Sequence, residues 1–247
     1  MAISGGPDIV EDGLVLCLDA ADQNSYSGSG NTWYDLSGNG NNGTISGAPY
    51  GDVNGGVFIF NSYNDKIVIP HNSMFNFGSV FSLFTWVKIN DLTPIPWAVG
   101  SSIRNIFAKK ARFNNTEKGW SFQYDFRNVG ILELRNNNGL GFYDSTPISP
   151  VDNKTLLYQT SQYNYTGFTL NNSILKFYIN GTQRGTTAIA YTDNDTTNDI
   201  YIGDAYPSVD QDDALLMNLS HTTLYNRVLS SEDVLKNYNA TKGRFGL

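Results

Sequence analysis

The segment from Phe81 to Asn90, FSLFTWVKIN, constrains the fold more strongly than any other part of the sequence. In an extended strand, alternate residues face opposite sides of the sheet, which puts F, L, T, V and I on one side and S, F, W and K on the other. Both sides therefore carry apolar side chains. This pattern is typical of a central strand in a sheet that is covered on both faces.

Many other short apolar or alternating segments predict further strands. The residues between them are rich in Asn, Gly, Ser and Asp, which favour turns, and aromatic residues, which favour pleated sheets, make up 13% of the chain. Asn180-Gly181 predicts a two-residue hairpin turn. One helix is predicted from Ser230 to Tyr238, with Ser230 or Ser231 as its cap. The further strands are predicted at Gly13–Asp19, Val57–Phe60, Lys66–Pro70, Asn105–Lys110, Gly119–Phe126, Val129–Arg135, Thr155–Tyr163, Ile174–Ile179, Thr182–Gly185, Asp199–Gly203 and Leu215–Tyr225.

The length and the composition predict one globular domain. A chain of 247 residues is long for a single domain but usual for an all-β sandwich, and no linker divides it. The one cysteine, Cys17, excludes an intrachain disulfide and is expected to be a buried apolar residue. The net charge of −7 with no basic stripe argues against nucleic acid as a partner, and no apolar run is long enough to span a membrane. The first residues, MAISGGP, do not resemble a secretory signal peptide.

Seven segments spread over residues 13–247 form a recognisable series. They are GLVLCLDA (13–20), NSYSGSG (24–30), TWYDLSGNGNNGT (32–44), FSLFTWVK (81–88), LKFYING (175–181), LYNRVLSSED (224–233) and NYNATKGRFGL (237–247). In this order and spacing they resemble the laminin-G-like domains of the concanavalin A-like lectin/glucanase superfamily. The last segment resembles the variant found in phage and other virion structural proteins.

The resemblance and the strand pattern together imply an all-β fold. We expect a two-sheet antiparallel β-sandwich (a concanavalin A-like jelly roll) with a short C-terminal helix. The sandwich is expected to span residues 13–247, and residues 1–12 are expected to form an N-terminal arm. Because one fold hosts many functions, function has to be argued from the residues of a site.

The sequence predicts a protein that is not an enzyme. Sandwich glycosidases carry two carboxylates on one strand face as Glu-x-Asp-x-x-Glu, and this pattern is absent. Glu133 has no acidic partner two or five residues away, although a pair could assemble from different strands. His71 and His221 lie in no nucleophile motif and are expected at the surface or in packing. No catalytic residue is therefore predicted.

No cofactor is required by the sequence, but a structural calcium ion at a rim loop is a candidate. Laminin-G-like domains often hold calcium there, and calcium takes six to eight oxygen ligands. The residues 193–199 lack the glycine and glutamate of a calcium loop and are expected to be a solvated loop. Ser220 and His221 stand where many relatives carry an acidic residue, which weakens the calcium prediction. The candidate ligands are Asp35, Asn39, Asp210, Asp212 and Asp213.

Aromatic residues near loops are candidates for a glycan site, since saccharide sites pair aromatic faces with Asn and Asp side chains. Most aromatic residues in such a chain must pack in the core. Tyr191 and Tyr206 are further aromatic residues that could reach loops. The predicted glycan-binding residues are Trp97, Trp120, Tyr124 and Tyr143.

Two functions compete. The first is a non-enzymatic virion structural protein that decorates a capsid or belongs to a fibre, neck or baseplate. Its partners would be other virion proteins, with a homo-oligomer as a candidate state, and it would be located in the virion. The second is a carbohydrate-binding adhesin module that recognises host-surface glycans. Both can hold at once, because a decoration protein can also bind sugars.

Overall fold

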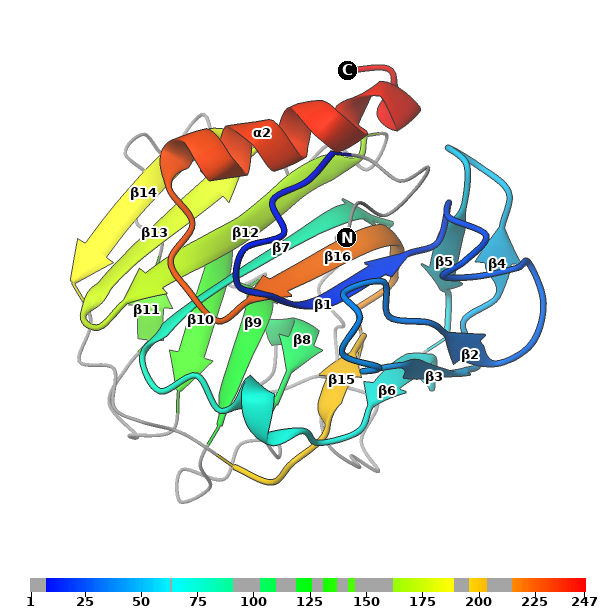
Figure 1. Ribbon diagram of the computed structural model, residues 1–247, viewed down its shortest axis with the longest axis horizontal. Coiled ribbons are helices and arrows are strands. Elements are labelled where there is room, and N and C mark those ends of the chain that lie inside the picture. Colours follow the sequence, from blue (N-terminus) through cyan, green and yellow to red (C-terminus); the bar gives the residue numbers. More distant parts are fainter. Residues whose placement is uncertain are drawn as a thin grey trace.

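The chain folds into a sandwich of two antiparallel β-sheets, with a C-terminal helix on the outer face of one of them (Figure 1). The computed structural model describes residues 8–62, 64–90, 103–109, 119–125, 131–136, 142–144, 162–188, 196–203 and 215–247. The fold class predicted from the sequence is confirmed.

The first sheet, sheet A, is the one that carries the helix. Its central strand is β7 (Val80–Ile89), which pairs with β12 (Asn164–Asn171) on one side and β16 (Met217–Tyr225) on the other. The N-terminal strand β1 (Leu14–Asp19) also pairs with β16. The remaining strands, outward from β12 and from β16, are β13 (Ile174–Ile179), β14 (Thr182–Ala188), β5 (Val57–Phe60) and β4 (Tyr50–Gly51).

The second sheet, sheet B, lies on the other side of the core. A short 3₁₀ helix, η1 (Ser73–Phe75), follows one of its strands. In order across the sheet, its strands are β11 (Phe142–Asp144), β10 (Ile131–Asn136), β9 (Trp120–Asp125), β8 (Ile103–Ala108), β15 (Ile200–Ile202), β6 (Lys66–Ile69), β3 (Gly43–Ser46) and β2 (Thr32–Trp33).

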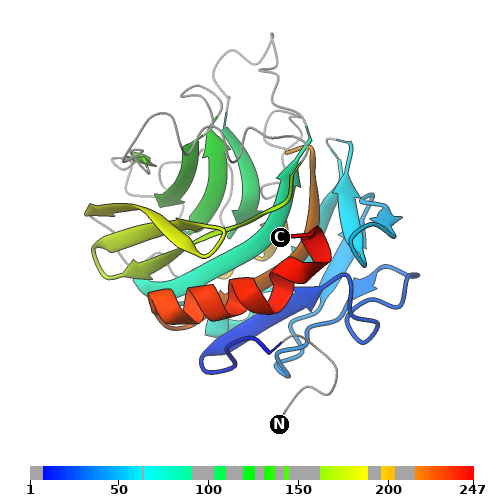
Figure 2. The ribbon, with the colours of Figure 1, turned by 90° about the horizontal axis from the view of Figure 1, so that it is seen from above.

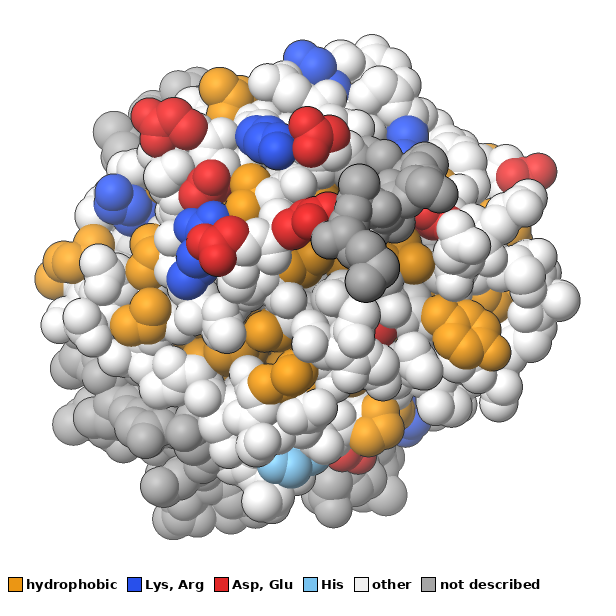
Figure 3. Space-filling model, in the orientation of Figure 1, with side chains coloured by type: hydrophobic (Ala, Val, Ile, Leu, Met, Phe, Trp, Pro, Cys, Tyr) orange, Lys and Arg blue, Asp and Glu red, His pale blue; other side chains and the backbone are white. Residues whose placement is uncertain are grey.

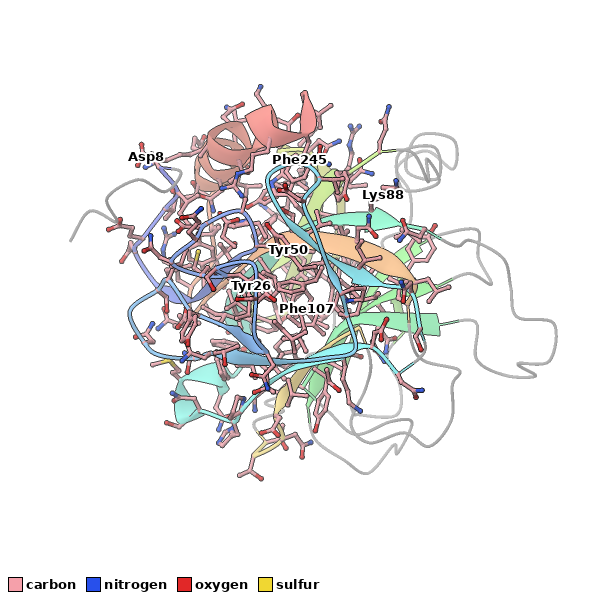
Figure 4. All side chains as sticks on the ribbon, turned by 90° about the vertical axis from the view of Figure 1, so that its right-hand side faces the viewer. Asp8, Tyr26, Tyr50, Lys88, Phe107 and Phe245 are labelled. Atoms are coloured by element: carbon pink, nitrogen blue, oxygen red, sulfur yellow. The ribbon has the colours of Figure 1, made fainter. Side chains whose placement is uncertain are left out.

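Strand β7 is covered on both faces, as its sequence predicts. Phe81 and Leu83 belong to the core between the sheets, while Phe84 and Trp86 belong to a second cluster on the outer face of sheet A. Figure 4 shows the difference: Phe107, from sheet B, lies between the two sheets, and Phe245 lies on the outer side of sheet A. The sandwich therefore has two apolar layers, one on each side of sheet A.

The helix α2 (Ser231–Thr241) and the 3₁₀ helix η2 (Lys242–Phe245) form the cover of this second layer (Figure 2). The Phe245 ring stacks on Trp86 with a centroid separation of 4.1 Å, and the Trp86 indole N–H donates to Thr241 at 2.7 Å. Within the described residues no helix is long and apolar enough to cross a membrane. The outer face of sheet A is thus occupied by the chain itself.

Residues 8–12, part of the predicted N-terminal arm, pack against the same cover. The Val10 N–H donates to Asn237 at 2.8 Å, and the Val10 carbonyl accepts from the Tyr225 hydroxyl at 3.0 Å. An exposed ion pair joins Asp8 to Lys236 at 3.1 Å. Figure 3 shows acidic and basic side chains interspersed over this side of the molecule, where α2 lies. Residues 1–7 are outside the described part of the chain.

One strand of sheet A was not predicted from the sequence. This strand is β12, which begins at Asn164 and pairs with β7. The strand expected at Thr155–Tyr163 lies outside the described residues, except for positions 162 and 163, which are not in a strand. Gly167 of β12 reads as a strand breaker in the sequence. In the structure a Cβ at position 167 would clash with the carbonyl oxygen of Leu83, so glycine allows the close approach of β7 and β12.

The start of α2 yields a stability prediction. Ser230 Oγ accepts from the Asp233 N–H at 3.1 Å, and the Asp233 carboxylate accepts from the Ser230 N–H at 3.1 Å, which confirms Ser230 as the cap. Replacing Ser230 with alanine should lower the free energy of unfolding by about 1 kcal/mol. Chemical denaturation measures this change. Ser173→Ala, in the exposed β12–β13 turn, is the control and should stay within about 0.5 kcal/mol of the parent. An equal effect of both would contradict the capping role.

Candidate functional site

A row of buried polar side chains lies on the face of sheet B that points away from the core. In β9, Phe122 belongs to the core, so its neighbours Ser121 and Gln123 face outward. Gln123 pairs in register with Asn105 of β8, and its amide N–H donates to the Asn105 side-chain oxygen at 2.8 Å. Asn105 and Gln123 are each 4% exposed, and Ser121 is fully buried. We call Asn105, Ser121 and Gln123 the polar row.

Two atoms of the polar row have unmet hydrogen-bonding capacity. Within the part of the chain that the structure describes, Ser121 Oγ and Gln123 Oε1 are buried and have no hydrogen-bond partner. Buried polar atoms are nearly always paired, because an unpaired one costs about 1–3 kcal/mol. Such a pair of atoms on one face is suited to a ligand hydroxyl group or an ordered water.

An aromatic residue lies on the same face of sheet B, two strands away from Ser121. Tyr201 of β15 pairs in register with Ala108 of β8, and Ala108 pairs with Ser121. Ile200 and Ile202, its neighbours in β15, belong to the core, so Tyr201 is on the outward face and is 8% exposed. The small side chain of Ala108 separates the tyrosine from the serine. An aromatic ring beside amide and hydroxyl groups is the combination that saccharide sites use.

The backbone register extends the polar row to two acidic residues. Gln123 pairs with Glu133 of β10, and Glu133 pairs with Asp144 of β11. Direct cross-strand partners occupy the same face of a sheet. The backbone register thus sets an acidic residue opposite Glu133, although the sequence has none two or five residues away from it. Carboxylate pairs at defined separations hydrolyse glycosides, so cleavage of a bound sugar has to be measured alongside binding.

The aromatic residues predicted for a glycan site are not on loops where the structure describes them. Trp120 is 3% exposed and Tyr124 is fully buried, and both pack in the core from β9. Tyr143 belongs to β11, where its backbone pairs in register with Leu134. Trp97 is outside the described residues. The expectation that Trp120 and Tyr124 reach a loop surface is wrong, because strand alternation turns them inward.

Sequence reasoning missed Asn105, Ser121, Gln123 and Tyr201. A signal for two of them was present in β9, whose sequence WSFQYD alternates large aromatic and polar residues. Reading the aromatic set as the core face would have put Ser121 and Gln123 on the outward face. Asn105 and Tyr201 had no such signal, because a β-bulge between Asn105 and Phe107 shifts the alternation in β8, and β15 is only three residues long.

Asp35, a predicted calcium ligand, is saturated by hydrogen bonds from the protein. Its carboxylate accepts from the Cys17 N–H at 2.9 Å and the Asn41 N–H at 3.0 Å. It also accepts from the N–H and the hydroxyl of Ser37, at 2.9 and 2.7 Å. A carboxylate offers about four lone-pair positions, so these donors leave no oxygen for a cation. Through the bond from Cys17, Asp35 holds its loop against β1.

Asn39, the other predicted metal ligand that the structure describes, donates hydrogen bonds to the protein. Asn39 turns its amide nitrogen toward Ser37 Oγ, at 2.9 Å, and toward the carbonyl groups of Leu14 and Val15. The amide nitrogen is a donor and cannot ligate a cation. Asp210, Asp212 and Asp213 lie outside the described residues. Among the residues that the structure describes, no three His, Cys, Asp or Glu side chains are grouped as metal ligands. Calcium at the remaining loops stays a prediction.

A buried ionic cluster lies beneath the C-terminal tail. The Arg244 guanidinium binds the Asp19 carboxylate through two contacts of 2.6 Å, and Asp19 is 1% exposed. Burial alone would raise the pKa of Asp19, but His221 and Arg244 together hold it below its usual range. Burial lowers the pKa of the fully buried His221 to about 4, although Asp19 opposes this shift.

Cys17 completes this cluster but is not a nucleophile. Its sulfur lies 3.9 Å from His221 Nε2, and the side chain is 2% exposed, as the sequence predicts. Burial and the neighbouring Asp19 raise the pKa of the thiol well above its usual range. A reactive cysteine needs the opposite, a lowered pKa and access to solvent. The cluster of Cys17, Asp19, His221 and Arg244 therefore anchors the tail and leaves the polar row as the candidate site.

The sequence identifies the family. The family model described as the concanavalin A-like lectin/glucanases superfamily matches residues 61–235. The chain belongs to this superfamily. No curated protein sequence matches the chain. The antiparallel sandwich of this superfamily member is covered by α2 on sheet A, and its polar row lies on sheet B.

Solved structures share the fold of this superfamily member at low sequence identity. The binding domain of Paraclostridial Mosquitocidal Protein 1 has a TM-score of 0.70 and 17% identity, over 93% of this chain and 52% of that one. Domain 4 of AbnA, an extracellular arabinanase from Geobacillus stearothermophilus, in complex with arabinotriose, has a TM-score of 0.59 and 16% identity, over 92% and 98%. Trypanosoma rangeli sialidase in complex with sialic acid has a TM-score of 0.61 and 15% identity, over 94% and 33%. The chain thus spans about half of the mosquitocidal binding domain, and these likenesses show the fold alone.

Proposed function

We propose that the chain is a carbohydrate-binding domain and that the polar row with Tyr201 binds saccharide hydroxyl groups. The observation that carries the proposal is the pair of buried, unpartnered atoms, Ser121 Oγ and Gln123 Oε1. A saccharide hydroxyl can donate to the Gln123 oxygen and accept from Ser121, which meets both needs with one ligand. The Tyr201 ring offers an apolar surface for the C–H groups of a saccharide, which complements the hydrogen bonds to its hydroxyl groups.

The structural neighbours support this function over the virion hypothesis. Two of those described are binding or saccharide-bound domains, and one of them was solved with an oligosaccharide bound. The virion role and the virion location stay predictions, because the neighbours named above are binding domains and glycosidases. Mass spectrometry of purified particles checks them, and absence of the chain from every particle would rule them out.

The test of the binding function separates recognition from stability. A glycan array followed by calorimetric titration should find a saccharide that binds saturably. Gln123→Leu and Ser121→Ala should each weaken that binding about tenfold or more, since about 1.4 kcal/mol corresponds to one lost hydrogen bond with a buried partner. Ser121→Ala should lower the free energy of unfolding by no more than about 1 kcal/mol, because it removes an unsatisfied buried atom. Gln123→Leu also removes the donor to the buried Asn105 side-chain oxygen, so it should cost about 1–3 kcal/mol, and its affinity has to be measured where the variant is fully folded.

Gln183→Leu provides the matched control for Gln123→Leu. Gln183 is exposed on β14 of sheet A, where its amide N–H donates to Thr186 Oγ1 at 2.7 Å. This variant should leave saccharide affinity unchanged. Saccharide affinity that survives Gln123→Leu and Ser121→Ala would place the binding site elsewhere and overturn the proposal.

Mass spectrometry of the recovered saccharide should show it intact, and cleavage products would contradict a non-enzymatic function.

A further inference from the structure

We propose that residues 242–247, which follow α2, form an acid-released latch over the outer face of sheet A. When His221 takes up a proton, it replaces Arg244 as the partner of the Asp19 carboxylate, and the latch leaves the sheet. The proposal is independent of the saccharide site, because the latch lies on the other sheet. Two features carry it: the position of His221 beneath the latch, and the competition of two cations for one carboxylate.

His221 lies directly beneath the latch. The backbone register places Asp19 of β1 on one side of it and Trp86 of β7 on the other, and direct cross-strand partners share one face of a sheet. Consecutive latch residues contact these two neighbours. Arg244 binds Asp19 through two contacts of 2.6 Å, and the Phe245 ring stacks on the Trp86 ring. The latch therefore encloses His221, which is fully buried.

The closed latch has one carboxylate for two basic side chains. The guanidinium of Arg244 engages both oxygens of Asp19, and within the described part of the chain His221 Nδ1 is buried without a hydrogen-bond partner. A protonated imidazole donates from both ring nitrogens, so proton uptake creates a second cation that requires the same carboxylate. The Arg244 side chain is 22% exposed and can exchange the carboxylate for water. The fully buried His221 has no such alternative, so Arg244 is the cation that leaves.

The groups around His221 set the direction of the switch. The titratable and charged groups that act on it from the described elements are Cys17 and Asp19 of β1 and Arg244 of η2, while β7 presents the uncharged Trp86. Cys17 stays neutral in acid, because burial raises the pKa of its thiol. Acid therefore changes the charge of His221 first, and this change sets it against Arg244.

Linkage between proton uptake and release fixes the size of the response. Burial lowers the pKa of His221 to about 4 under the closed latch, where Asp19 opposes this shift and Arg244 adds to it. In the released state His221 meets water, and its pKa returns to about 6.5 or above. The released state thus binds more protons between these values, so it gains as the pH falls. From pH 7.5 to pH 5 the equilibrium should shift toward release by about 30-fold.

The latch can open while the sandwich stays folded. Each of residues 242–247 is half-buried or exposed, whereas the main core lies on the other side of sheet A. Segments with few buried contacts open at a lower free energy than core strands. Release uncovers two rings that Phe245 covers, Trp86 and Tyr163, whose centroids lie 4.1 and 4.9 Å from the Phe245 ring. Acid would thus expose an aromatic surface on sheet A.

Hydrogen exchange of the Trp86 indole N–H, followed by NMR on the full chain, measures the release. This N–H donates to Thr241 at 2.7 Å beneath Phe245. Its opening constant, the observed rate divided by the intrinsic rate, should rise about 30-fold from pH 7.5 to pH 5. At both pH values it should exceed the opening constant of the Leu83 amide, in the centre of β7, by at least about 100-fold. Equal constants would show that Trp86 opens only when the whole domain unfolds and would overturn the proposal.

Three variants identify the group that responds to acid. His221→Gln should hold the opening constant of Trp86 within about threefold over this pH range, since the proton acceptor is gone. His71→Gln, whose site lies beside Asp199 at the end of β6, is the control and should keep the rise. Phe245→Ala weakens the latch without removing a titrating group, so it should raise the constant at both pH values and keep the ratio. It tests the proposal even where His221→Gln does not fold. A pH-independent constant in the parent, or a full rise in His221→Gln, would refute the latch.

Discussion

Replacing Arg244 with methionine should lower the free energy of unfolding by about 3–5 kcal/mol. The substitution leaves the Asp19 carboxylate, which is 1% exposed, without the guanidinium that contacts both of its oxygens. An unpaired buried charge is strongly destabilising, because the interior cannot replace the lost hydration. Urea denaturation followed by circular dichroism measures the change. The tail carrying Arg244 also holds Phe245 on Trp86, so part of the outer apolar layer is expected to loosen as well.

Two further variants separate the buried charge from other effects of the substitution. Lys236→Met removes the exposed ion pair with Asp8, whose side chain is 91% exposed, and should cost less than about 1 kcal/mol. Adding Asp19→Asn to Arg244→Met removes the stranded charge and should recover part of the loss. If Arg244→Met costs no more than Lys236→Met, the buried pair does not anchor the tail.

Acid should destabilise the chain well above the pH at which its carboxylates protonate. In the folded chain the pKa of His221 is about 4, whereas an unfolded histidine takes up its proton near pH 6.5. Between these values the unfolded state binds more protons, so stability falls as the pH is lowered. The full contribution is present above pH 6.5 and is lost by about pH 4, and its size is about 3 kcal/mol. Denaturation curves collected across this range measure the slope.

The histidine variants identify the source of the slope. His221→Gln should flatten the pH dependence between pH 6.5 and 4, whatever it does to the stability at neutral pH. His71→Gln is the control, because the pKa of His71 is also lowered by burial and by Lys109, but this side chain is partly exposed. The control should remove a smaller part of the slope. An unchanged slope in His221→Gln would show that this histidine is protonated in the folded chain.

The fold was largely predictable from the sequence because strand alternation is a direct consequence of backbone geometry. The segments predicted at 57–60 and 174–179 coincide with β5 and β13, and the two-sided pattern of β7 is matched by apolar layers on both of its faces. Strand β12 was not found, because Gly167 serves a close approach between neighbouring strands that no local pattern records. The packing of β12 against its neighbour β7, rather than a local sequence pattern, explains the glycine in this strand.

The candidate site was much less predictable. Trp120 and Tyr124 were chosen by residue type, but the pleat of β9 directs them into the core and leaves Ser121 and Gln123 on the outward face. The pairing of Glu133 with Asp144 joins residues of two strands, and only the register of the sheet brings them together. Asp35 resembled a cation ligand because a carboxylate that accepts four hydrogen bonds, three from its own loop and one from β1, looks the same in sequence as a free one.

The placement of the two ends of the described chain has a practical consequence. Asp8 contacts Lys236 of α2, and the tail that follows α2 stacks Phe245 on Trp86, so both ends lie on the outer side of sheet A. The polar row lies on the opposite side of the sandwich, across the core. A sensor chip or bead that captures the protein through a tag at either end would therefore turn the outer side of sheet B toward the solution. Immobilised formats suit the saccharide measurements, and a fusion partner at either end would lie on the side away from the polar row.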